Sequence, residues 1–362
     1  MSGPKTHSWI EDLNVYVSGK SKAASYSNPV KLSANESALG PSPKAMKAYI
    51  NAAKDLHRYP DPSYNDLRMA LSDKYQIDTS RIVCGVGSDE ILKLACRAYL
   101  KPGDEAIFVA HSFSMYPIAI KSVGGIPVEV KDEHYTANTD NIIDAVNDKT
   151  KIIFLANPNN PTGTYLDKNE IERLWNNIPN HVLLVLDAAY AEFVSNEDYE
   201  AGITLVEKSK NVLMTRTFSK LYGLAALRLG WGYSCREVSQ TLDKIRDPFN
   251  VPSSAQVAGV AALGDIEFEE NAKIHTIKWR EWLTKELSAL GFNVIPSSTN
   301  FILFEVNQQN KSAENANEFL VRNGYILRYY SDQGLENFLR VTIGTANENK
   351  ALVSLLKEYL DK

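Results

Sequence analysis

The sequence has few cysteines, and those it has are poorly placed for cross-linking or metal binding. Only Cys84, Cys96 and Cys235 occur among 362 residues, far apart and without a CxxC or Cys/His spacing. This argues against a disulfide framework and a structural zinc site, and favours a reducing compartment. The sequence predicts no metal.

Long apolar runs and long basic runs are missing too. No window approaches the roughly 20 apolar residues that a membrane helix needs, and the first 20 residues lack the apolar centre of a signal peptide. The formal net charge is −5, and the Lys and Arg residues form no long run. We therefore expect a cytoplasmic protein that binds neither nucleic acid nor a membrane.

The middle of the chain alternates short apolar runs with longer amphipathic segments, as in ordinary globular proteins with a real core. The runs carry few polar residues, as strands buried on both faces of a parallel sheet do. They are residues 105–110, 126–130, 151–156, 182–187, 211–215 and 228–233. The pattern predicts an α/β fold with a mostly parallel central sheet flanked by helices.

The two ends of the chain have a different pattern. Residues 1–30 have weak periodicity and are predicted to form an N-terminal arm. Residues 31–250 would form the large domain. From residue 251 a long helical pattern leads into strand-like stretches and a last helix, which predicts a smaller α+β domain over 251–362.

Polar residues gather where the predicted strands end. In an open α/β sheet, ligands bind outside the carboxyl ends of the strands. The ends carry residues 85–88, 111–113, 157–163 and 187–190, then Ser219, Lys220 and Arg228. One such end is ordinary, but several residue types at one edge indicate a ligand site.

The stretch GVGSDE begins with two glycines and Ser88 and then turns helical. Such a helix start offers backbone N–H groups to an anion. A plain helix start, with Ser88 as the N-cap, explains it about equally well. It is no dinucleotide fingerprint, because GxGxxG is incomplete and no apolar strand leads cleanly into it, so a nicotinamide dehydrogenase is disfavoured.

Two charged residues suggest which ligand this would be. Lys220 follows a predicted strand, and a lysine removed from water becomes a nucleophile toward aldehydes. Asp187 closes a buried strand and needs a partner there, which could equally be a salt bridge or a helix end. A Schiff-base lysine, an anion cradle and a carboxylate facing a pyridine nitrogen together predict pyridoxal phosphate.

The predicted catalytic residues are Lys220, Asp187 and Tyr190. Ser88, Ser219 and Arg228 would hold the phosphate, Phe113 would stack on the ring, and Asn160 and Tyr190 would bond its phenolic oxygen. The predicted cofactor contacts within this chain are Gly87, Ser88, Asp89, Phe113, Asn160, Asp187, Tyr190, Thr217, Ser219, Lys220 and Arg228.

At these residues the chain resembles a known family, the class II pyridoxal-phosphate-dependent aminotransferases of fold type I, most closely the histidinol-phosphate branch. The stretches that carry the resemblance run in family order from about residue 10 to the C-terminus. They are KLSANESALGPSP, HRYPDPSYNDLRMALSDKY, GVGSDEILKL, NPNNPTGT, LDAAYAEF, TRTFSKLYGLAALRLGW, DPFNVPSSAQ, TNFILFEV and FLRVTIGT.

The resemblance implies roles that the residues alone did not. Lys220 would form the Schiff base and carry the proton at the substrate's Cα. Tyr59 would reach the cofactor phosphate of a partner subunit, which implies a homodimer with shared sites. Arg340 would bind the substrate anion. The other implied substrate contacts are Tyr16, Asn35 and Arg328.

The implied reaction exchanges an amino group between histidinol phosphate and 2-oxoglutarate, giving imidazole-acetol phosphate and glutamate in histidine biosynthesis. The chain departs from the family pattern at Ala188, at Ser37-Ala38 and at Val15, and the last two departures weaken the substrate assignment. An aromatic amino acid aminotransferase and a threonine-phosphate decarboxylase stay open as alternatives. A non-catalytic cofactor-binding module is disfavoured, because no basic DNA-binding helix is visible.

Overall fold

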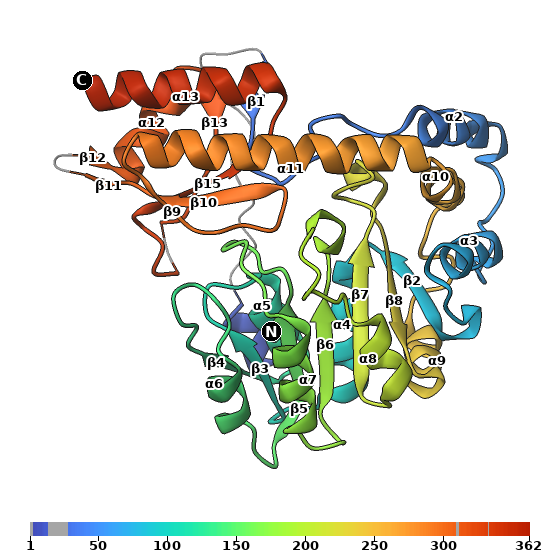
Figure 1. Cartoon of the computed structure of the whole chain (residues 1–362). Coiled ribbons are helices and arrows are strands. Elements are labelled where there is room, and N and C mark those ends of the chain that lie inside the picture. The colour runs from blue at the N-terminus through green and yellow to red at the C-terminus, as the bar shows by residue number, and fades with distance from the viewer. Residues whose placement is uncertain (1–2, 14–27, 309–310, 332) are drawn as a thin grey trace.

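A computed structural model describes residues 3–13, 28–308, 311–331 and 333–362. Its largest element is a seven-stranded sheet in the order β2-β8-β7-β6-β5-β3-β4 (Figure 1). The strands are β2 (Ile82–Val86), β3 (Glu105–Val109), β4 (Ile126–Val130), β5 (Thr150–Ala156), β6 (Leu183–Asp187), β7 (Val212–Thr217) and β8 (Leu229–Ser234). Within this sheet only β8 runs antiparallel to its neighbours. The predicted α/β fold, with a mostly parallel central sheet, is confirmed.

One expectation about this sheet was wrong. An apolar strand, β2, does lead into the glycine segment, and Ile82, Val83 and Cys84 on it are fully buried. The run is short and is interrupted by Gly85, which weakens its strand signal. Helix α4 (Ser88–Tyr99) follows at once, and its N-cap is Gly87 rather than Ser88, with no side-chain cap.

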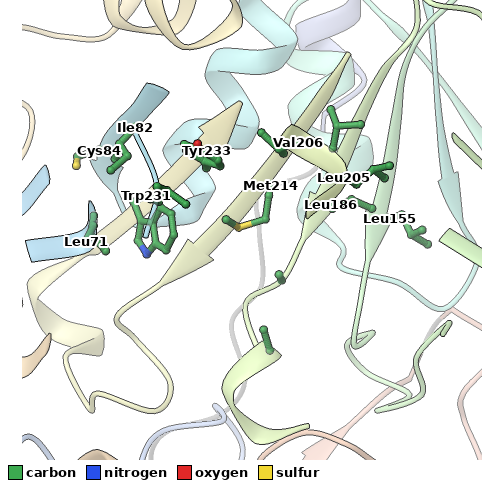
Figure 2. Packing of buried hydrophobic residues seen from close by; sticks show 14 of the residues in the cluster. Leu71, Ile82, Cys84, Leu155, Leu186, Leu205, Val206, Met214, Trp231 and Tyr233 are labelled. Carbon is green, nitrogen blue, oxygen red and sulfur yellow. The ribbon is translucent and has the colours of Figure 1, made fainter. Parts of the chain in front are cut away.

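Helices cover both faces of the sheet because neighbouring strand residues point to opposite sides. On β5, Ile153 and Leu155 join one core cluster, whereas Ile152 and Phe154 join the other. The first cluster packs under α3 (Asn65–Tyr75), α6 (Thr139–Asp144), α7 (Lys168–Asn176), α8 (Ile203–Lys208) and α10 (Ser253–Leu263). The second packs under α4, α5 (Met115–Ser122) and α9 (Arg236–Ile245). Figure 2 shows part of the first cluster, where Leu186 and Met214 on β6 and β7 lie beside Leu205 and Val206 of α8.

A second, four-stranded sheet lies at the other end of the molecule, in the order β14-β15-β10-β9 (Figure 1). Its strands are β14 (Arg328–Tyr329), β15 (Phe338–Thr342), β10 (Phe301–Glu305) and β9 (Asn293–Val294). Its core is closed by α11 (Ile266–Ala289), α12 (Ala313–Arg322) and α13 (Ala346–Asp361). A short hairpin, β11 (Asn307–Gln308) with β12 (Lys311–Ser312), extends it.

The segment before α2 (Pro43–Ala52) connects the two parts of the molecule. Its strand β1 (Val30–Lys31) pairs in parallel with β13 (Tyr325–Ile326), next to the smaller sheet. At the other junction, Ala255 and Ala258 of α10 lie in the core cluster of the larger sheet, after residue 250. The division into domains at residues 30 and 250 stays a prediction.

The strand directions bring the predicted polar ends to one edge. Strands β2, β3, β5, β6 and β7 all end there, and antiparallel β8 begins there, which places Arg228 at the same edge. Among the described residues, no helix is long and apolar enough to cross a membrane. The same residues contain no cluster of three or more His, Cys, Asp or Glu side chains suited to a metal ion.

Candidate active site

A cavity of about 480 Å³ lies at this edge of the large sheet, within the size range of small-molecule sites. One wall comes from the ends of the large sheet's strands, and the other from β1, the segment after it, β14 and β15. Its lining includes the predicted residues Asn35, Ser88, Asp89, Phe113, Asn160, Asp187, Tyr190, Thr217, Ser219, Lys220, Arg228, Arg328 and Arg340. Side chains that are far apart in the sequence therefore meet in one place.

Lys220 lies three residues beyond the end of β7, and its amine faces the ring of Tyr190 at 5.6 Å from the centroid. Burial, and after it the positive charge of Arg340, lower the pKa of Lys220 from 10.5 to about 8. Near neutral pH a sizeable fraction of this amine is thus unprotonated. An unprotonated amine can act as a nucleophile or as a base.

Asp187 ends β6 and is 6% exposed. Tyr116 Oη donates to its Oδ2 at 3.0 Å, and Thr215 Oγ1 donates to its Oδ1 at 3.3 Å. Burial raises the pKa of Asp187 to about 6, while these hydrogen bonds oppose the shift. Among the described residues no Lys, Arg or His lies within salt-bridge distance of this carboxylate, so it can still take a cationic N–H donor from a ligand.

An anion cradle forms around the N-terminus of α4. Arg228 Nη1 lies 3.3 Å from Ser219 Oγ, and its Nη2 lies 3.2 Å from Asp89 Oδ2. Gly87 is required here, because a Cβ on it would approach Arg228 Nη2 to 2.5 Å and its φ is +78°. Helix N–H groups, serine hydroxyls and a guanidinium together make a site for a phosphate.

Tyr190 and Asn160 also line the cavity. Burial raises the pKa of Tyr190 to about 12, so its phenol stays protonated. Asn35 Nδ2 donates to Tyr190 Oη at 2.9 Å, which holds the phenol in place. Asn160 accepts a hydrogen bond from Arg340 Nη1 through its Oδ1, which leaves its amide nitrogen as a donor.

Two arginines face each other on the wall that the smaller sheet provides. Arg328 on β14 and Arg340 on β15 are cross-strand partners, and both line the cavity. Like charges in such positions repel, and a buried cation without an anion is unfavourable. Arg340 is 6% exposed, donates from Nη2 to Ser33 O at 2.9 Å, and keeps Nε buried without a partner among the described residues.

The sequence was compared with known families and proteins. Residues 27–356 match the family model of aminotransferases of class I and II. The chain belongs to that family. The sequence of this aminotransferase is 48% identical, over 99% of both chains, to that of the histidinol-phosphate aminotransferase of Paramagnetospirillum magneticum. It is 47% identical, again over 99% of both, to the enzyme of the same name from Nitrobacter hamburgensis.

Solved structures of other aminotransferases have the same fold. Histidinol-phosphate aminotransferase from Sinorhizobium meliloti, in complex with pyridoxal 5′-phosphate, superposes with a TM-score of 0.89 at 26% identity, over 99% of this chain and 98% of the other. A mutant aspartate aminotransferase from Thermus thermophilus reaches 0.83 at 21% identity, over 97% and 98%, which supports the fold alone.

The residues of the cavity fit the group bound in the Sinorhizobium structure. Pyridoxal phosphate presents a phosphate, a pyridine nitrogen, a phenolic oxygen and an aldehyde. The cavity of this aminotransferase has the helix-end cradle for the first, the buried Asp187 for the second, and Tyr190 with Asn160 for the third. Lys220 has the lowered pKa that suits an amine for the fourth.

One predicted residue lies elsewhere in the structure. Tyr59 is 82% exposed, stacks on Phe249 at 4.6 Å between ring centroids, and does not line this cavity. Tyr16 falls outside the described residues. The predicted roles of all the site residues stay predictions, since position in a cavity is not yet a function.

The sequence analysis missed several residues that shape the site. Tyr116 and Thr215 fix Asp187, yet one lies on a helix and the other inside a strand, so neither stood at a strand end. Tyr330 lines the cavity with Arg328 over its ring. Lys31 and Glu36 also line it. Their only signal was their place in KLSANES, the first of the family-like stretches.

Proposed function

We propose that this aminotransferase uses pyridoxal phosphate to transfer an amino group between histidinol phosphate and 2-oxoglutarate, as a step of histidine biosynthesis. The names of relatives 46–48% identical over almost the whole chain support this substrate. The observation that carries the proposal is the pair Arg328 and Arg340. These two cations line one cavity, and a buried guanidinium nitrogen of Arg340 has no partner among the residues that the structure describes.

The cofactor would lie along the ends of the large sheet's strands. The α4 N-terminus, Ser219 and Arg228 would hold its phosphate, and Asp187 its ring nitrogen. Tyr190 and Asn160 would bond its phenolic oxygen. When bound, it supplies an electron sink that stabilises negative charge at the substrate's Cα.

Lys220 would move the proton in this reaction. Its amine, with a pKa lowered to about 8 chiefly by burial, would take a proton from Cα and deliver it to the aldehyde carbon (C4′) of the cofactor. The lysine is fixed at the end of β7 and lies within the cavity, so the transfer needs no diffusing base. Tyr190, next to the amine, would hold its position.

The arginine pair would bind the anionic end of either substrate. Glutamate carries an α-carboxylate next to its amino carbon, and histidinol phosphate carries a phosphomethyl group in the same place. Arg340 can meet both, since its guanidinium presents several donors in one plane. Arg328, directly across the strands, would add the second positive charge that a phosphate dianion needs.

The test is a set of half-reactions. Cofactor-loaded enzyme is mixed separately with histidinol phosphate, histidinol, glutamate, phenylalanine and threonine phosphate, and the absorbance of the bound cofactor is followed. We expect histidinol phosphate to react about 10²-fold or more faster than histidinol, because losing the phosphate leaves the cations unpaired. It should exceed phenylalanine by a similar factor.

Other outcomes would redirect the proposal. Phenylalanine reacting as fast as histidinol phosphate would make the chain an aromatic aminotransferase, since the pocket would recognise the ring more than the phosphate. Carbon dioxide release from threonine phosphate, without an amino acceptor, would indicate a decarboxylase. If glutamate were the only substrate to react, the assignment of histidinol phosphate would be wrong, whereas the proposed transamination chemistry would stand.

We also propose a homodimer in which Tyr59 reaches the partner's cofactor phosphate. Its exposed ring lies outside its own cavity and stacks on Phe249, and the described residues expose further large apolar side chains, which are frequent at protein interfaces. The further side chains include Met46, Ile50, Leu56, Met69, Val257 and Ile266. Sedimentation should give a dimer, and Tyr59→Phe should retain cofactor less tightly, by about 10-fold for one charge-assisted hydrogen bond. A monomer with unchanged cofactor retention would contradict this.

A cytoplasmic location and the arm, large and small domains over 1–30, 31–250 and 251–362 complete the proposal. Cys84, Cys96 and Cys235 are all free thiols in the structure, which fits a reducing compartment. The two separate core clusters around the two sheets support the division into a large and a small domain. Limited proteolysis with mass mapping would test the boundaries.

A further inference from the structure

A transaminase of this type has to accept two unlike side chains in one cavity. In the reaction proposed above, one substrate ends in an imidazole with an N–H donor, and the other ends in a carboxylate. The arginine pair meets the anionic group that the two substrates have in common next to the reacting carbon. The opposite ends of the two substrates need different partners, one an acceptor and one a cationic donor.

The segment between β1 and α2 brings such a pair of partners to the cavity. Lys31, on β1, and Glu36, five residues later, both line it, and Lys31 Nζ lies 3.0 Å from Glu36 Oε1. The same segment forms part of the substrate wall, because Ser33 O accepts from Arg340 and Asn35 donates to Tyr190. Glu36 is also near enough to Lys220 to act on its pKa: burial lowers that pKa to about 8, and the Glu36 carboxylate opposes the change.

Stability does not explain why this ion pair is there. The side chains are 33% and 47% exposed, and pairs with such exposure contribute about 0–1 kcal/mol to folding. A weak pair can open at little cost when either member finds another partner. Both members belong to a wall that also carries Arg340 and Arg328, so a substrate held by those arginines lies within the same cavity as the pair.

We propose that Lys31 and Glu36 together recognise the two side chains of the ping-pong reaction. Glu36 accepts the imidazole N–H of histidinol phosphate, and Lys31 pairs with the γ-carboxylate of glutamate. In each half-reaction one member binds the substrate and the other is left to solvent. The inference rests on the proposed function, because it assigns the second end of the same two substrates.

The test compares two variants in separate half-reactions. Glu36→Met and Lys31→Met each remove one charge and keep a long side chain. The second-order rate constants of the half-reactions with histidinol phosphate and with glutamate are measured, and the ratio of the two is compared with that of the wild-type enzyme. Glu172→Met and Lys208→Met, from an ion pair of similar exposure between α7 and α8, are the matched controls. Thermal unfolding of all four variants checks that they are folded.

The rate constant for histidinol phosphate divided by that for glutamate should fall about 10-fold in Glu36→Met, which is the effect of losing one hydrogen bond to a charged group. It should rise by a similar factor in Lys31→Met, where the remaining carboxylate also repels glutamate. A structural role would lower both rates together and leave the ratio unchanged, which would overturn the inference. Wild-type enzyme that fails to react with histidinol phosphate would overturn the proposed function and this inference with it. Wild-type enzyme that reacts, with variants of unchanged ratio, would overturn only the inference.

Discussion

The two halves of the cavity differ in how they are built. The half at the ends of the large sheet's strands holds the buried carboxylate of Asp187, which has fixed partners in Tyr116 and Thr215. The half formed by β1, β14 and β15 carries a partly exposed ion pair and an arginine nitrogen that has no partner within the described part of the chain. A bound cofactor favours the first arrangement and exchanging substrates favour the second.

The largest expected effect lies in the buried half. Lys220→Ala should reduce transaminase turnover by at least about 10³-fold, because it removes both the nucleophilic amine and the base. A steady-state assay measures this, with Lys208→Ala on α8 as the control that retains activity. Near-normal turnover of Lys220→Ala would contradict the proposed roles of Lys220 as nucleophile and base.

The next effect should come from the substrate half. Arg340→Leu should lower kcat/KM for both amino donors by about 10²-fold, because the buried guanidinium is their main anion contact. The absorbance of the bound cofactor should stay unchanged. Arg340→Lys should recover only part of the loss, since an ammonium lacks the planar fork of donors. Loss of cofactor in Arg340→Leu would mean that the halves are not separable.

The lowered pKa of Lys220 can be tested without turnover. In cofactor-free enzyme, the rate at which a small acylating reagent labels Lys220 should rise with pH and level off above about pH 8. At pH 8 its neutral fraction should exceed that of an ordinary lysine by about 10²-fold. Peptide mass spectrometry gives both rates. Labelling that still climbs at pH 10, as for surface lysines, would contradict the burial of this amine.

The lowered pKa of Lys220 also links folding stability to pH. Between pH 8 and 10.5 the unfolded chain binds more protons at this group than the folded chain does, so folding becomes more favourable as pH rises through this range.

The smallest effect should come from Tyr116, whose hydroxyl donates a hydrogen bond to Asp187. Tyr116→Phe removes a hydrogen bond that lowers the pKa of Asp187, against the larger effect of burial, which raises it. The carboxylate should then stay protonated to higher pH, and the acid limb of kcat/KM should move up by about one pH unit. Activity at pH 8 should change little. Tyr165→Phe, whose hydroxyl bonds Asp198 outside the cavity, is the control. An unmoved acid limb would mean that Asp187 does not set it.

The buried half was largely predictable from the sequence. Strands covered on both faces read as apolar runs, and the first polar residue after each run had to lie at the sheet edge. This placed Asp187, Ser219 and Lys220 correctly in one cavity. Strand β2 was missed because it is five residues long and contains a glycine, so it has little β signal of its own.

The substrate half was not predictable from local pattern. Arg340 lies inside β15, and its place at the cavity depends on how the smaller sheet packs against the large one, which no local periodicity encodes. Only the resemblance to a family indicated it. Lys31 and Glu36 gave no local signal beyond their place in a family-like stretch, because a charged pair with this exposure resembles any solvated surface segment.

Helix α11 contacts both the large and the small part of the molecule. Its 24 residues span about 36 Å at 1.5 Å per residue. Near its start, Glu269 is ion-paired with Lys74 of α3, whereas Leu283 and Leu287 near its end are buried in the core of the smaller sheet. Between them, Arg280 donates to the carbonyl of Phe193, three residues after Tyr190. If the helix tilted by about 5° around its Glu269 end, its Leu287 end would move by about 3 Å. The same movement would displace the backbone beside Tyr190. A shift of the smaller sheet relative to the larger one would therefore reach the backbone beside Tyr190 through this one helix.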